Sequence, residues 1–148
     1  MIFRKGGMIV NGQLRPELSK KNQYWIGRHR YYELKHFCLQ YPIWKQLRAI
    51  LDGPGPYPSF YNTPVKISDI SDPTLRAAEI RLYYSERMTM VEEAAKQADA
   101  FLSGYIIYGV TMGVSYDIMN AKFHLPCTKD TYYVLYRKFF WILDKLRM

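Results

Sequence analysis

Residues 113–147 read GVSYDIMNAKFHLPCTKDTYYVLYRKFFWILDKLR, and this stretch decides the fold of the carboxyl-terminal part of the chain. Gly113 predicts the end of a preceding helix, because glycine takes the left-handed conformation there without strain. Ser115 and Thr128 predict the N-caps of two further helices, since their hydroxyls can accept hydrogen bonds from the first turn. The pattern therefore predicts helices over about residues 99–112, 116–122 and 129–146, in the outline of a helix-turn-helix.

The last of these helices has an apolar side and a basic side. Apolar residues recur at spacings of four, three, four and three, which predicts a buried stripe of Tyr132, Tyr136, Phe139, Leu143 and Leu146. The cations outside this stripe are Arg137, Lys138, Lys145 and Arg147. In the short helix before it, we expect Ile118 and Met119 to face inward. Any three-helix bundle ends in an amphipathic helix, so a plain bundle is the alternative reading of this pattern.

The first turns of the final helix carry the candidate DNA contacts. A recognition helix enters the major groove by these turns, where polar side chains meet base edges and backbone amides meet phosphates. We expect Lys129→Ala and Arg137→Ala to weaken specific DNA binding with little loss of fold. The candidate contacts are Ser115, Thr128, Lys129, Asp130, Tyr133, Arg137 and Lys138.

The rest of the chain also has helical periodicity. Asp72 is a plausible N-cap and Pro73 a first helical residue for a long helix that continues to about Gln97. Before it, two helices are expected from about Leu18 onward, meeting at Pro42. Because almost no alternating run of strand-forming residues occurs, the chain predicts an all-α fold.

Composition divides the chain into three segments. Residues 1–51 form a basic amino-terminal arm with helices, and Asn11-Gly12 favours either a flexible arm or a short hairpin near its start. Residues 52–71 are a Pro-rich linker, because DGPGPYPSFYNTP excludes a helix or a central strand. Residues 72–148 hold the long helix and the helix-turn-helix.

The charge is uneven along the chain. The sequence has 21 Lys and Arg against 13 Asp and Glu, a net charge of +8. Both ends are basic and the middle is acidic, which suits a protein whose ends approach a polyanion. Cations interleave with aromatic residues near the amino terminus, a combination that grips phosphates and stacks on bases, although it also makes ordinary helix faces. The candidate contacts there, to DNA or to a partner, are Lys20, Lys21, Arg28 and Arg30.

Several classes of protein are disfavoured. No apolar run is long enough for a membrane span, and no export signal is recognisable, so we expect a cytoplasmic protein. Cys38 and Cys127 are far apart and predict reduced thiols rather than a disulfide scaffold or a zinc site. Phosphate-binding glycine loops, HExxH and nucleophile elbows are missing from the sequence, which predicts a protein without enzymatic activity or cofactor.

The carboxyl-terminal half resembles the end of phage RinA/ArpU-type late-gene transcriptional regulators, whose end is similar to region 4 of bacterial sigma factors. The stretches that carry the resemblance are residues 113–116, 125–127, 130–132 and 136–140, together with 72–99. The resemblance implies binding to a promoter in double-stranded DNA, or contact with host RNA polymerase, to switch on phage packaging and structural genes.

Two other classes stay open. A DNA-packaging protein similar to a small terminase subunit would also be small, basic and helical, but it would assemble into a ring. An adaptor that binds a host protein would use the acidic middle and the Pro-rich linker, and its affinity for DNA would be weak. The sequence leaves the oligomeric state open, so a homo-oligomer is one of the expectations to be tested.

Overall fold

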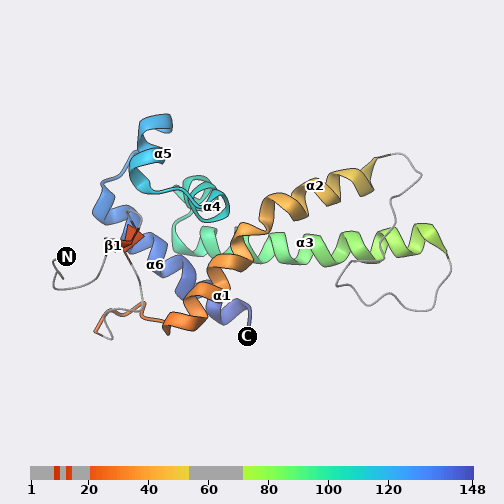
Figure 1. Ribbon diagram of the computed structural model, residues 1–148, viewed down its shortest axis with the longest axis horizontal. Coiled ribbons are helices and arrows are strands. Elements are labelled where there is room, and N and C mark those ends of the chain that lie inside the picture. The colour runs from red at the N-terminus through yellow and green to blue at the C-terminus, as the bar shows by residue number, and fades with distance from the viewer. Residues whose placement is uncertain (1–8, 11–12, 15–20, 54–71) are drawn as a thin grey trace.

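The computed structural model describes residues 9–10, 13–14, 21–53 and 72–148, and within these residues the fold is all-α apart from one very short hairpin (Figure 1). Strands β1 (Ile9–Val10) and β2 (Gln13–Leu14) pair antiparallel, with Ile9 opposite Leu14. The prediction of a short hairpin is therefore confirmed, although its turn at Asn11-Gly12 lies outside the described residues. Lys20 and most of the Pro-rich linker also lie outside them.

Helices α1 (Arg28–Leu39) and α2 (Tyr41–Asp52) follow one another with a break at Gln40. Pro42 occupies the first turn of α2, where its missing N–H costs no helical hydrogen bond. The two predicted helices are thus confirmed, and they meet two residues earlier than expected.

The first of these helices begins later than the sequence pattern predicted. A start near Leu18 is wrong for residues 21–27, which form turns and extended backbone before α1. The Asn22 side chain is the reason: its Oδ1 accepts a hydrogen bond from the Tyr24 N–H at 2.8 Å, and the Asn22 carbonyl accepts one from Trp25 N–H at 3.0 Å. Such local side-chain bonds compete with helix formation. We call residues 21–27 the amino-terminal strap.

Helix α3 (Pro73–Ala98) is the longest element and packs along both α2 and α6 (Figure 1). It begins as predicted: the Asp72 carboxylate accepts a hydrogen bond from the Thr74 N–H at 2.9 Å, and Pro73 is its first residue. The distal ends of α2 and α3 extend away from the other helices as an antiparallel pair (Figure 1).

Helices α4 (Ser103–Met112), α5 (Tyr116–Phe123) and α6 (Lys129–Leu146) complete the chain. Gly113 ends α4 in the left-handed conformation, with φ 66° and ψ 33°, as predicted. The expected start of α4 near Asp99 is four residues too early. The Asp99 carboxylate instead accepts a hydrogen bond from the Leu102 N–H at 2.9 Å and closes a turn between α3 and α4.

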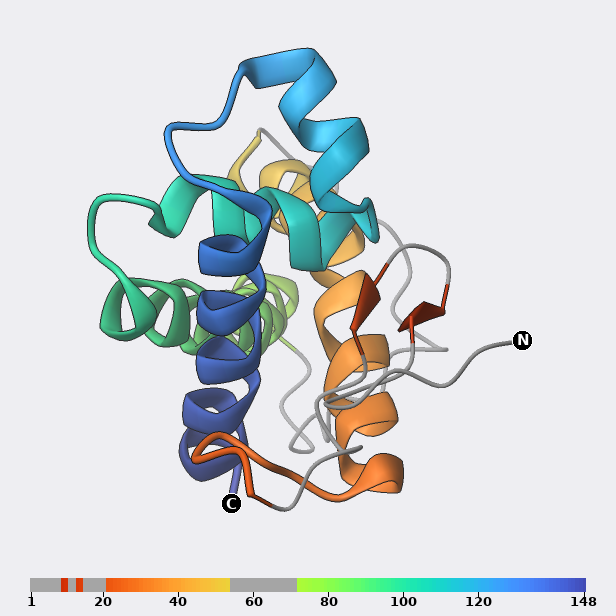
Figure 2. The same cartoon turned by 90° about the vertical axis from the view of Figure 1, so that its left-hand side faces the viewer.

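Aromatic packing joins α1 to α6, which lie side by side in Figure 2. The Tyr31 and Tyr136 hydroxyls share a hydrogen bond of 2.5 Å, and the Tyr31 ring meets the Phe140 ring edge-on at 5.2 Å between centroids. At the rim, Arg30 Nε donates to Asp144 Oδ1 at 2.6 Å. The buried core is therefore continuous from the amino-terminal helices to α6.

Candidate nucleic-acid interface

The turn between α5 and α6 is held by side chains from both helices. The Tyr116 hydroxyl donates to the Cys127 carbonyl at 2.6 Å, and the Tyr116 N–H donates to the Tyr133 hydroxyl at 3.2 Å. The Asn120 side-chain oxygen accepts a hydrogen bond from the Leu125 N–H at 2.9 Å. These bonds fix where α6 begins relative to α5 (Figure 2).

Both predicted caps are present. The Ser115 hydroxyl accepts from the Ile118 N–H at 3.4 Å, and the Thr128 hydroxyl accepts from the Thr131 N–H at 3.3 Å. Their side chains therefore set the first turns of α5 and α6. His124 ends α5 in the left-handed conformation with φ 53°, a position where a non-glycine residue is uncommon.

Replacing Thr128 tests the cap of α6. We expect Thr128→Ala to lower the free energy of unfolding by about 1 kcal/mol, because the Thr131 N–H loses its acceptor. Thr128→Ser keeps the hydroxyl and is the matched control. Urea denaturation followed by circular dichroism measures both variants. An equal loss in the two would mean that the threonine methyl group, rather than the cap, stabilises the helix.

The first turn of α6 exposes a mixed set of polar groups to solvent: Lys129, Asp130 and Thr131. Lys129 Nζ lies 2.9 Å from Asp117 Oδ2 of α5, and this hydrogen bond raises the pKa of the lysine. Both partners are well exposed, so the pair contributes little to stability and both side chains remain accessible. One turn further, Val134 is exposed as well.

Tyr133 does not belong to this exposed set, and its prediction as an outward DNA contact is wrong. Its side chain is only 2% exposed, because α5 packs over that side of α6. Burial raises the pKa of Tyr133, and its hydroxyl holds the Tyr116 N–H. Tyr133 therefore helps to hold α5 against α6 through this hydrogen bond.

The predicted apolar faces need two further corrections. Met119 is fully buried as expected, but Ile118 is 60% exposed, since it lies on the solvent side of α5. Leu146 at the end of α6 is exposed, whereas the other four residues of the predicted stripe are buried. Phe140 and Ile142 are buried although the stripe omitted them, because α1 packs beside α6 and covers a second row of side chains.

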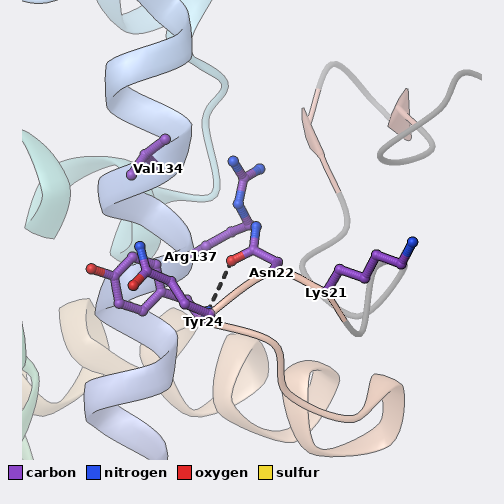
Figure 3. A pocket seen from close by; sticks show the side chains of 6 residues that line it. Lys21, Asn22, Tyr24, Val134 and Arg137 are labelled. Carbon is purple, nitrogen blue, oxygen red and sulfur yellow. Dashed lines mark hydrogen bonds between the residues drawn. The ribbon is translucent and has the colours of Figure 1, made fainter.

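The amino-terminal strap crosses the outer side of α6 below this exposed turn. The Tyr24 ring meets the Trp141 ring edge-on at 5.5 Å between centroids. Between strap and helix lies an open cavity of about 340 Å³ (Figure 3), lined by Lys21, Asn22, Gln23, Tyr24, Val134 and Arg137. Lys21 and Arg137, predicted as separate candidates, thus line one cavity.

Arg137 is half-buried at the edge of this cavity. Burial lowers the pKa of its guanidinium, and the field of Asp130 opposes that effect. The Arg137 Nε is shielded from solvent and has no hydrogen-bond partner among the described residues. The group is therefore a cationic donor whose hydrogen-bonding capacity is incompletely used. Lys138 lies beside it, also half-buried.

The other predicted amino-terminal candidates lie elsewhere. Arg30 is engaged with Asp144 and also with Glu33, at 2.8 Å, so the expectation that it contacts DNA or a partner conflicts with its role in joining α1 to α6. Arg28 is exposed at the start of α1. The sequence analysis did not identify Asn22, Gln23 and Val134 as cavity residues. Asn22 was the available signal, because asparagine favours a turn and so indicates non-helical backbone before α1.

Comparison with protein-family models, with curated proteins and with solved structures found no match to this chain. The resemblance to late-gene regulators therefore stays a prediction. Within residues 21–53 and 72–148, no helix is long and apolar enough to cross a membrane. The same part of the chain holds no group of three or more His, Cys, Asp or Glu side chains arranged to bind a metal ion.

Proposed function

We propose that this protein is a DNA-binding transcription regulator of a phage or prophage, and that the first turns of α6 read promoter DNA in the major groove. One observation carries the proposal. Helix α6 begins at a capped, side-chain-locked turn after α5, and its first turn exposes Lys129, Asp130 and Thr131.

The chemistry of this turn supports base recognition. A lysine donates to the O6 and N7 acceptors of guanine, a carboxylate accepts from the cytosine amino group, and a threonine can do either. Val134 adds an apolar contact of the kind that suits a thymine methyl group. Two buried tyrosines behind the turn, Tyr116 and Tyr133, hold its backbone in place by hydrogen bonds. The exposed side chains of the turn therefore keep fixed positions relative to one another.

The charge of the chain supports the same proposal. The net charge of +8 favours association with a polyanion, and the basic groups Arg137 and Lys138 follow the exposed turn along α6. Contact with host RNA polymerase is the further role implied by the resemblance to sigma region 4. Activation of late genes would then combine promoter binding by α6 with polymerase contact by another surface of the chain.

Lys129→Ala tests the recognition turn. We expect roughly tenfold weaker binding to the specific fragment, since one good base contact contributes about 1–3 kcal/mol of discrimination. Binding to an unrelated fragment should change much less. The measurement is a salt-titrated binding assay with fluorescent fragments of the encoding genome and an unrelated fragment as competitor.

Lys45→Ala, which removes an exposed lysine on α2, is the matched control for charge and should leave the preference unchanged. If Lys129→Ala lowered the affinity for the specific fragment and for the unrelated fragment equally, base recognition by this turn would be contradicted. Equal, weak binding of the unaltered protein to all fragments would contradict the regulator, and a ring-shaped oligomer in light scattering would favour a packaging protein instead.

A further inference from the structure

The cavity between the amino-terminal strap and α6 is a second site, which adjoins the recognition turn at Val134. It lies one to two turns along α6 from the exposed first turn, at Val134 and Arg137. In a helix-turn-helix complex the first turns of the recognition helix enter the groove, so groups further along the helix face the groove wall. The wall of the groove is the phosphate backbone.

The charged groups that line this cavity are both cations, Lys21 and Arg137, and the amide side chains of Asn22 and Gln23 lie with them. The Arg137 guanidinium and the Asn22 side chain lie on the same side of the strap, and Lys21 extends outward from it (Figure 3). The Asn22 side-chain oxygen already accepts from the Tyr24 N–H, which leaves its amide hydrogens to face a ligand. An anion is the ligand that such a set fits.

The carboxylates of α6 do not neutralise this set. Asp144 is paired with Arg30 at 2.6 Å. Asp130 acts on Arg137 only through its field, and no ion pair between these two described residues is formed. The Arg137 Nε is shielded from solvent and has no partner among the described residues, so the guanidinium keeps a donor that no described side chain uses. The cavity is open and its volume of about 340 Å³ leaves room for a phosphate group.

We propose that this cavity binds a backbone phosphate of DNA, with the Arg137 guanidinium as the donor and Lys21, on the strap, adding positive charge nearby. The inference rests on the proposed function, since the phosphate belongs to the duplex that α6 would read. The strap then positions the protein on the backbone, while the first turn of α6 distinguishes sequences. The amino-terminal basic segment and the helix-turn-helix, far apart in the sequence, thereby act on the same duplex.

Nuclear magnetic resonance of the Arg137 Nε–Hε group in the full chain tests the phosphate contact directly. We expect this signal to shift when a short duplex is added, and to shift in the same direction, at much higher concentration, with inorganic phosphate. The assignment comes from loss of the signal in Arg137→Lys. No shift with the duplex would overturn the proposal, and a shift with inorganic phosphate alone would assign the cavity to a free anion instead.

The salt dependence of DNA binding tests how much the proposed phosphate contact contributes to affinity. We expect Lys21→Ala and Arg137→Lys each to lower the affinity of the protein for the specific fragment and for the unrelated fragment by the same factor. Lys21→Ala should reduce the slope of log affinity against log salt by about 0.9, the value for one lost phosphate contact. Lys45→Ala is the control and should leave the slope unchanged.

The two proposals fail in different ways. An unchanged slope in Lys21→Ala, with sequence preference intact, overturns the phosphate site and leaves the recognition turn standing. A duplex-induced shift at Arg137 without any sequence preference retains the phosphate site and overturns the regulator.

Discussion

Phe139→Ala is expected to lower the free energy of unfolding by about 3–5 kcal/mol, the range for removing a fully buried aromatic ring. The Phe139 side chain has no exposed surface, and its ring meets that of Phe140 edge-on at 5.0 Å between centroids. It belongs to the buried core, so the truncation leaves a cavity there.

Urea denaturation followed by circular dichroism measures this loss. Phe101→Ala is the matched control, because the Phe101 ring is 80% exposed and its removal should change stability by no more than about 0.5 kcal/mol. A loss for Phe139→Ala as small as that of the control would mean that the ring is not part of a fixed core. A smaller slope of the free energy of unfolding against urea concentration would indicate a change in the unfolded or the native state instead.

The caps were predictable from the sequence because each depends on a few neighbouring residues. Asp72, Ser115 and Thr128 accept hydrogen bonds from N–H groups two or three positions later, and Gly113 adopts its left-handed conformation by local sterics alone. These interactions do not depend on how the helices pack, so the starts of α3, α5 and α6 and the end of α4 follow from residue type and spacing.

The orientation of α6 was predictable only in part. Tyrosine and phenylalanine occupy more than one side of this helix, so periodicity identified the row that contains Tyr136 and Phe139 but not the second row at Tyr133 and Phe140. Which of these rings is buried depends on where α1 and α5 pack, and that is a tertiary property. The pattern therefore predicts Tyr133 as a DNA contact, although its hydroxyl accepts a hydrogen bond from Tyr116 N–H of α5.

The cavity could not be predicted from the sequence. Lys21 and Arg137 stood out individually as cations, yet no local pattern places them together, because their proximity depends on the strap crossing α6. That crossing follows from the Asn22 turn and from the contact between Tyr24 and Trp141, which joins residues from opposite ends of the chain. A fold prediction from local pattern therefore recovers the capped first turn of α6 but not the cavity beside it.

Gly109→Ala is the second substitution with a large expected effect, because the space beside Gly109 is filled by a side chain of α6. Gly109 is buried, and a Cβ added there would overlap the Tyr132 hydroxyl and approach Met119 Cε to 3.3 Å. The Tyr132 ring is itself buried, so neither helix can yield without disturbing the core. We expect a loss of about 1–3 kcal/mol in the free energy of unfolding, the usual cost of overpacking.

Tyr132→Phe should remove the obstacle. The Tyr132 hydroxyl is buried without a hydrogen-bond partner among the described residues, and burial raises its pKa, so it is a neutral group that contributes no bond there. Deleting it alone should leave stability unchanged or raise it by up to about 1 kcal/mol, because an unsatisfied buried hydroxyl is unfavourable.

The double variant Gly109→Ala/Tyr132→Phe tests whether the loss of stability in Gly109→Ala comes from the steric clash with the Tyr132 hydroxyl. With the hydroxyl gone, the new methyl group still meets Met119 Cε and Tyr132 Cζ at 3.3 Å, which requires these neighbours to shift by a few tenths of an ångström. Alanine offsets this cost, because it stabilises a helix interior by about 1 kcal/mol relative to glycine. We therefore expect the double variant to unfold at a urea concentration at or above that of the unaltered protein, with a coupling energy of about 1–3 kcal/mol between the two sites. Additive losses would show instead that Gly109 is required for its backbone and not for the room it leaves Tyr132.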